Sequence, residues 1–168
     1  EIRQFVLDDK GCVAIIAWGL PMAAHGMARD TELAVHCALH LMTGFKAMRE
    51  ESGEQNINIE PGPHIGVAAG EAYVGLLGSM YRCEYAMVGP SVNLAARLMG
   101  KAPPWHVLVD ETVHANAGQT SIEFQKRDPV KAKGYDAKID VFEPLFETRE
   151  VNNWGIHRNL VEQWDMLA

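Results

Sequence analysis

The segment from Glu84 to Arg97, EYAMVGPSVNLAAR, constrains this chain more than any other stretch. Its first residues predict a short strand, the Val-Gly-Pro step predicts a turn, and the remainder predicts a helix. Asn93 and Arg97 are four residues apart, so they project from the same side of that helix. The expected apolar face of the helix lies about a third of a turn away and consists of Val92, Ala95, Ala96 and Met99.

An amide and a guanidinium held together beside a glycine turn are suited to stabilising negative charge on phosphate oxygens. An isolated Asn-x-x-x-Arg pair is more often part of a solvated helix edge. The pair therefore predicts a phosphate site only in combination with the sequence around it.

The preceding run, HIGVAAGEAYVGLLGS from His64 to Ser79, has glycine at positions 66, 70, 75 and 78. Two apolar runs flank Gly70-Glu71, which predicts a β-hairpin that turns there. Glycines inside such strands favour a bulge or a close backbone approach. A charged turn at residues 81–84 and then a further strand are expected to follow.

Together these segments resemble the catalytic domain of class III nucleotidyl cyclases. In that family the region reads I-G-x-x-x-G-x-x-x-x-G-x-x-G, and then x-Y-x-x-x-G-x-x-V-N-x-A-x-R. A match that involves many residue types at fixed offsets is far more specific than a lone glycine motif. The chain matches every fixed position: Ile65, Gly66, Gly70, Gly75, Gly78, Tyr85, Gly89, Val92, Asn93, Ala95 and Arg97.

The resemblance implies an α+β fold, a ferredoxin-like βαββαβ core with extra strands whose N-terminal strand region is truncated here. Such domains act in pairs, with the active site in the groove between them. The cyclase domain is expected to span residues 1–147. Residues 148–168 are expected to form a linker and a helix that lead toward an ATPase-like module. This arrangement resembles the second catalytic half of soluble, bicarbonate-responsive adenylyl cyclases.

The remaining elements follow from local patterns. Residues 5–18 predict a hairpin with a tight turn at residues 8–11. A long helix is expected from Asp30 or Thr31, as its cap, to about Glu50. A strand at residues 107–109, a helix capped by Asp110, and strands at 122–125 and 139–146 complete the expected order. The expected apolar stripe of the long helix is Leu33, Cys37, Leu41 and Phe45.

Composition narrows the possible partners. The net charge of −7 disfavours nucleic acid, and no apolar run approaches the roughly 20 residues of a membrane span. The three cysteines show no metal spacing, which favours a reduced, cytoplasmic setting. The chain begins Glu-Ile-Arg with no initiator Met, so we expect an excised fragment.

The expected metal site is incomplete. The resemblance implies two aspartates that hold two Mg²⁺ or Mn²⁺ ions. The strand that carries the first aspartate is not found here, and the position of the second is occupied by Cys12, in a register supported by Trp18-Gly19. A thiolate does not replace a hard carboxylate ligand of Mg²⁺. We therefore expect no metal ligand in this chain and a metal-bearing partner half.

The resemblance also implies roles for five residues. Arg97 would contact phosphate oxygens and stabilise the pentavalent transition state, and Asn93 would orient the ribose of ATP. Lys10 would approach the adenine ring, although a solvated turn lysine is the alternative. Ala86 occupies the base-discriminating position but has no hydrogen-bonding side chain, so the backbone of Met87 would help to read adenine.

Three functions remain open at this stage. The first is one half of an adenylate cyclase that converts ATP to 3′,5′-cyclic AMP and pyrophosphate. The second is an inactive regulatory or dimerisation domain, motivated by Cys12 and Ala86. The third is a guanylate cyclase, which lacks here the side chains expected to read guanine.

Overall fold

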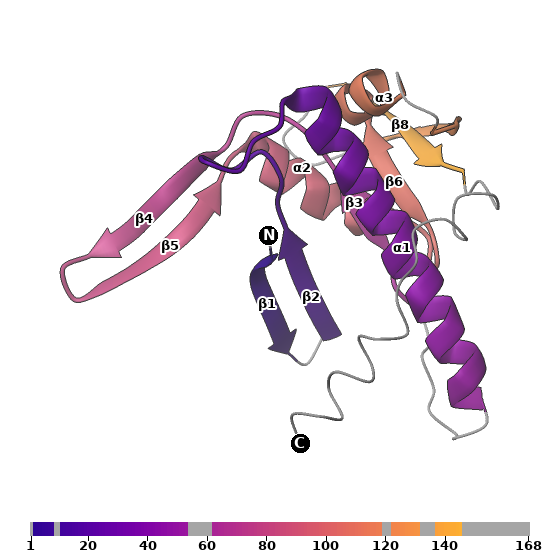
Figure 1. The fold of residues 1–168 in the computed structure, drawn as a ribbon, viewed down its shortest axis with the longest axis horizontal. Coiled ribbons are helices and arrows are strands. Elements are labelled where there is room, and N and C mark those ends of the chain that lie inside the picture. The colour runs from indigo at the N-terminus through magenta and orange to yellow at the C-terminus, as the bar shows by residue number, and fades with distance from the viewer. Residues whose placement is uncertain (1, 9–10, 54–61, 119–121, 132–136, 146–168) are drawn as a thin grey trace.

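A computed structural model describes residues 2–8, 11–53, 62–118, 122–131 and 137–145 (Figure 1). These residues form eight strands and three helices in a mixed order. The elements are β1 (Ile2–Asp8), β2 (Gly11–Ile16), α1 (Met27–Gly53), β3 (Ile65–Val67), β4 (Tyr73–Ser79), β5 (Arg82–Val88), α2 (Pro90–Met99), β6 (Val107–Asp110), α3 (Glu111–Ala117), β7 (Phe124–Val130) and β8 (Ile139–Pro144).

A four-stranded sheet in the order β3-β6-β8-β7 forms the centre of the molecule. β3 and β6 are parallel, whereas β8 runs antiparallel to both β6 and β7. Every residue of β6 is buried, which is typical of a strand covered on both faces. Since side chains alternate along a strand, Val107 and Val109 face one side of the sheet and Leu108 the other.

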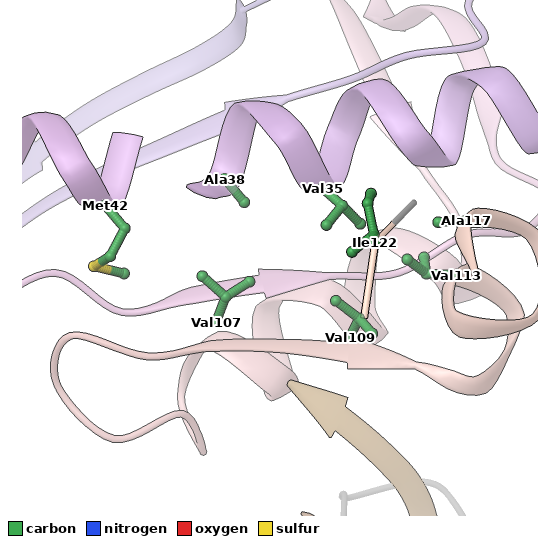
Figure 2. Packing of buried hydrophobic residues seen from close by; sticks show 8 residues of the cluster. All are labelled: Val35, Ala38, Met42, Val107, Val109, Val113, Ala117 and Ile122. Atoms are coloured by element: carbon green, nitrogen blue, oxygen red, sulfur yellow. The ribbon is translucent and has the colours of Figure 1, made fainter. Parts of the chain in front are cut away.

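The first face of the sheet is covered by α1 and α3. Figure 2 shows Val35, Ala38 and Met42 of α1 directed toward the strand residues Val107 and Val109. Val113 and Ala117 of α3 complete this cluster, together with Ile122.

The second face of the sheet is covered by α2. Leu94 and Leu98 of this helix pack with Leu108 of β6 and Val141 of β8. Leu98 is fully buried, so this contact fixes α2 firmly on the sheet.

Two hairpins form separate two-stranded sheets, β1–β2 and β4–β5. The β4–β5 hairpin projects away from the rest of the molecule as a long arm (Figure 1). Most of the large side chains of this arm are exposed, above all Met80 and Tyr81 at its tip, at 91% and 93%.

The structure confirms the expected α+β class and most of the local elements. The hairpin across residues 5–18 is present, with Asp8 opposite Gly11. The Asn93/Arg97 helix begins at Pro90, directly after the predicted glycine turn. Asp110 caps α3, since its carboxylate accepts a hydrogen bond from the backbone N–H of Val113 at 3.1 Å.

The hairpin predicted at Gly70-Glu71 is wrong. β3 pairs in parallel with β6, and β4 pairs instead with β5. Gly70 has a φ of +155°, and the chain leaves the central sheet there. Alternating glycines and apolar residues do not distinguish one hairpin from two strands that belong to different sheets.

The predicted start of the long helix is also wrong, because α1 begins at Met27. Asp30 lies inside the first turn, where its carboxylate accepts a hydrogen bond from the His25 backbone N–H at 3.1 Å. Thr31 likewise donates back to the Met27 carbonyl at 2.8 Å.

Both predicted apolar faces of helices need correction. The buried apolar residues of α1 are Val35, Ala38 and Met42, whereas Leu41 of the expected stripe is 39% exposed. In α2 the buried residues are Leu94 and Leu98, whereas Ala96 is exposed. The buried face could not be identified from the spacing of apolar residues, because alanine, methionine and cysteine occur on several sides of these helices and those sides have similar hydrophobicity.

Two predictions fall outside the described residues, namely the position of Lys10 and the linker and helix at residues 148–168. No helix in the described part of the chain is long and apolar enough to cross a membrane.

We predict that Met42→Ala lowers the free energy of unfolding by about 2–5 kcal/mol, because it opens a cavity in the packed core. Met48→Ala on the same helix is the matched control, since Met48 is 53% exposed and its truncation should cost under about 0.5 kcal/mol. Urea unfolding of the two variants measures the difference. Equal losses would contradict the packing of α1 on β6.

Candidate functional site

The candidate site is built around the first turn of α2. Gly89 precedes the helix, Pro90 occupies its first position, and the Asn93 N–H donates to the Gly89 carbonyl at 3.2 Å. A Cβ at Gly89 would lie 2.8 Å from both Ala72 Cα and the Glu71 carbonyl oxygen. Only glycine therefore allows the start of α2 to approach the turn between β3 and β4 this closely.

A second close approach holds the other end of the helix. A Cβ at Gly66 of β3 would collide with the Ala95 carbonyl oxygen and the Met99 backbone nitrogen of α2. The helix backbone thus lies directly on the strand, with Leu98 buried beside this contact. Two glycines that the sequence analysis matched to the cyclase pattern are the ones that permit this packing.

The structure brings Asn93 and Arg97 together on successive turns of α2. Asn93 is exposed, whereas Arg97 is half-buried and its Nη1 atom is buried within the chain. The pair therefore differs in accessibility. The amide faces solvent, and the guanidinium is partly held against the domain.

Ala86 and Met87 lie near the end of β5, just before the Gly89 turn. They pair with Gly75 and Val74 of β4, and both are half-buried. As neighbours in a strand they point to opposite faces of the hairpin, so their side chains cannot contact one base edge together.

An open cavity of about 620 Å³ lies beside the start of α2. It is lined by Gly19 together with residues 70–73 and 88–90. Three glycines contribute to this lining, and Glu71 is the acidic side chain among the described lining residues. Among the described site residues, Ala86, Met87, Asn93 and Arg97 do not line the cavity, although Val88 and Gly89 follow Met87 directly.

Two buried carboxylates support the segments around this cavity. Asp30 is 8% exposed and accepts hydrogen bonds from the backbone N–H of His25 at 3.1 Å and 3.3 Å. It also lies against Gly19, where a Cβ would come within 3.2 Å of its carboxylate. Asp30 therefore holds the loop that lines one side of the cavity.

Asp110 contacts the segment just before Gly70, another residue of the lining. Burial raises the pKa of its carboxyl group, and backbone hydrogen bonds from Val113 and Ala69 only partly offset this effect. The bond from Ala69 ties the end of β6 to the residue before Gly70. The cap that Asp110 forms on α3 was predicted, but its bond from Ala69 was not, because nothing in the sequence signals a contact between residues so far apart.

The described residues do not fit a divalent metal site. No group of three or more His, Cys, Asp or Glu side chains within them could hold an ion. Cys12, at the position expected for a metal aspartate, is exposed on β2 and is a free thiol. A lone thiol is a poor partner for the hard ions Mg²⁺ and Mn²⁺.

The chain matches the family described as the adenylate and guanylate cyclase catalytic domain over residues 12–144. It therefore belongs to this family, as the glycine and Asn/Arg pattern implied. The expected fold and the expected family are both confirmed.

Individual relatives point in the same direction. The chain is 30% identical over 152 residues to adenylate cyclase 1 of Rhizobium meliloti, covering 88% of the chain and 22% of that protein. It is 28% identical over 131 residues to human adenylate cyclase type 10, covering 78% of the chain and 7% of that protein. The chain thus spans a small part of the length of these relatives.

The fold also resembles a solved cyclase. The crystal structure of the adenylyl cyclase CyaB from P. aeruginosa superimposes with a TM-score of 0.79 at 23% identity. The superposition covers 88% of this chain and 72% of that one.

We predict that Gly66→Ala lowers the free energy of unfolding by about 1–3 kcal/mol, because the added methyl group forces α2 off the sheet. Gly44→Ala is the control, since a Cβ there meets nothing within 4 Å and alanine favours the helix by up to about 1 kcal/mol. Denaturant unfolding of both variants is the measurement. A Gly66 variant as stable as the Gly44 variant would rule out the close approach of α2 to β3.

Proposed function

We propose that this domain is one catalytic half of an adenylate cyclase that converts ATP to 3′,5′-cyclic AMP and pyrophosphate. In this reaction the ribose 3′-oxygen bonds to the α-phosphorus and loses its proton. The bond from the α-phosphorus to the oxygen that bridges to the β-phosphate breaks, and pyrophosphate leaves with the electron pair. Arg97 stabilises the charge that develops on the phosphate oxygens, and Asn93 orients the ribose.

The observation that carries this proposal is the combination of a tightly held α2 with Cys12 on β2. Gly66 and Gly89 position the helix that bears Asn93 and Arg97. A rigid element of this kind is what transition-state stabilisation requires, because a donor must not reorganise during the reaction. Cys12 stands where a carboxylate would be needed for a metal, so the two metal-binding aspartates belong to a partner half.

Mg²⁺ or Mn²⁺ is accordingly held by the partner and not by the described residues of this chain. We propose a pseudo-heterodimer in which the partner half, in the same or another chain, faces α2 across the nucleotide. The exposed β4–β5 arm supports such an assembly, because an isolated two-stranded hairpin with apolar side chains is only marginally stable in water. The exposed side chains that a partner would cover include Leu76, Met80 and Tyr81.

Base selection involves Ala86, Met87 and Lys10. Ala86 provides no side-chain hydrogen bond, so we propose that adenine is read by the backbone of Met87 and by Lys10. One missing side-chain hydrogen bond costs about 0.5–1.5 kcal/mol, which weakens discrimination without abolishing binding. We also propose a cytoplasmic location, which the three free cysteines support.

We predict that the isolated domain forms no cyclic AMP from ATP and Mn²⁺, and that activity appears when a cyclase half with both metal-binding aspartates is added. The reason is that neither half contains the whole site. A cyclic AMP assay of each half alone and of the mixture is the measurement. Substantial turnover by the isolated domain would refute the division of roles.

In the active pair, we predict that Arg97→Ala lowers kcat by about 100-fold, with a smaller effect on ATP binding, because the guanidinium acts mainly in the transition state. Arg29→Ala is the control, since Arg29 pairs with Glu32 at 2.7 Å on the surface of α1 and should leave kcat within about twofold. Steady-state kinetics separate kcat from KM. Equal losses in kcat and in ATP affinity would argue against a transition-state role.

A regulatory domain without turnover is the second candidate, and the same two residues, Cys12 and Ala86, favour it. The presence of both Asn93 and Arg97 argues against it, because a structural partner has no evident need for the pair. ATP binding by the mixed halves without any cyclic AMP would support the regulatory function.

Guanylate cyclase activity is the third candidate, since the family includes enzymes of both specificities. A comparison of ATP and GTP turnover by the mixed halves decides between them. Faster turnover of GTP would replace adenylate with guanylate cyclase in the proposal.

A further inference from the structure

One side-chain hydrogen bond ties the first turn of α2 to the turn between β3 and β4. The hydroxyl group of Ser91 donates to the backbone carbonyl of Glu71 at 3.1 Å, across 20 positions in the chain. Ser91 is the second residue of α2, and Glu71 follows Gly70, where the chain leaves the central sheet. The bond therefore connects α2 to the turn between β3 and β4, which is not adjacent to the helix in the sequence.

The bond is exposed to solvent, and the backbone of the two segments that it joins lies close together. A Cβ at Gly70 would lie 3.4 Å from the Cβ of Ser91, and a Cβ at Gly89 would lie 2.8 Å from Ala72 Cα. The start of α2 thus lies against the backbone of residues 70–72. The Ser91 hydroxyl adds a directional polar contact to an approach that is otherwise set by van der Waals distance.

Several contacts hold α2 on the sheet. Gly66 and Gly89 set how closely the helix approaches, and Leu94 and Leu98 bury its apolar face. These contacts are non-directional, whereas the hydrogen bond from Ser91 is directional and acts at the start of the helix. It therefore restricts the remaining rotation and tilt of α2.

We propose that Ser91 is a positioning residue for Asn93 and Arg97. Its hydrogen bond to Glu71 fixes the rotation and tilt of α2, so that the amide and the guanidinium meet the nucleotide in one geometry. This inference rests on the proposed function. Misplacement of a catalytic group by about 1 Å can cost about 100-fold in rate, so even a weak tether matters kinetically.

The test compares Ser91→Val with Ser91→Thr in the active pair of halves. Valine and threonine have nearly the same shape, and both add a methyl group to the side chain at this position, but only threonine retains the hydroxyl. We expect the valine variant to lose about fivefold in kcat with KM for ATP little changed, and the threonine variant to stay within about twofold of the parent. Equal kcat values for the two variants would overturn the inference.

A double substitution distinguishes positioning from general destabilisation. In an Asn93→Ala/Arg97→Ala background, the valine and threonine variants should have the same kcat, because both groups that Ser91 positions are then missing. A loss of about fivefold that persists in this background would show that Ser91 does not act through these two groups, and would overturn the inference.

Hydrogen exchange keeps the inference testable if the proposed function fails. If the parent pair forms no cyclic nucleotide, the proposed function is refuted, and exchange of the Asn93 amide in the domain alone is the remaining measurement. We expect faster exchange in the valine variant than in the threonine variant, by about fivefold, because the first turn of α2 is less firmly held. Equal exchange would refute the tether itself.

Discussion

The close contact between α2 and β3 is the constraint on which the rest of the structure depends. It requires a residue without a side chain at Gly66, since any Cβ would collide with the backbone of α2. Because the helix lies directly on the sheet, Leu98 is fully buried and α2 covers the second face of the sheet. The same contact determines where Asn93 and Arg97 lie. Core packing and the proposed chemistry therefore both depend on the absence of a Cβ atom at Gly66.

The sequence predicted those parts of the fold in which local signals agree with tertiary contacts. The turn before α2, the Asp110 cap and the β1–β2 hairpin each have a local cause, and each is present. The pairing of β3 could not be predicted, because its partner β6 lies about 40 residues later and both strands are short. The buried face of α1 was missed for a related reason. Ala38 and Met42 are buried because apolar side chains of α3 and β6 pack against them, which the hydrophobicity of the helix alone does not reveal.

The candidate site was predicted as a set of residue types, and the structure adds the framework that holds them. This framework includes hydrogen bonds between different segments of the chain. Asp30 bonds to the loop before α1, Asp110 to the residue before Gly70, and Ser91 to Glu71. Such links have no periodicity, so no pattern in one sequence reveals them. Asn93 and Arg97 could be predicted as site residues from the sequence. The difference in their exposure could not, because it depends on how α2 packs on the sheet.

The β4–β5 arm has a consequence for the order in which this domain forms. Its strands are joined by a two-residue tip and every pair in its ladder is local, so the arm can form in microseconds. The parallel pairing of β3 with β6 must instead close a chain segment that contains the whole arm and α2, which is slower. The arm can therefore form transiently before the core, although a two-stranded hairpin is only marginally stable in water. Folding of the core leaves its exposed apolar side chains uncovered, so an early encounter with the partner protects the arm from association with the wrong surfaces.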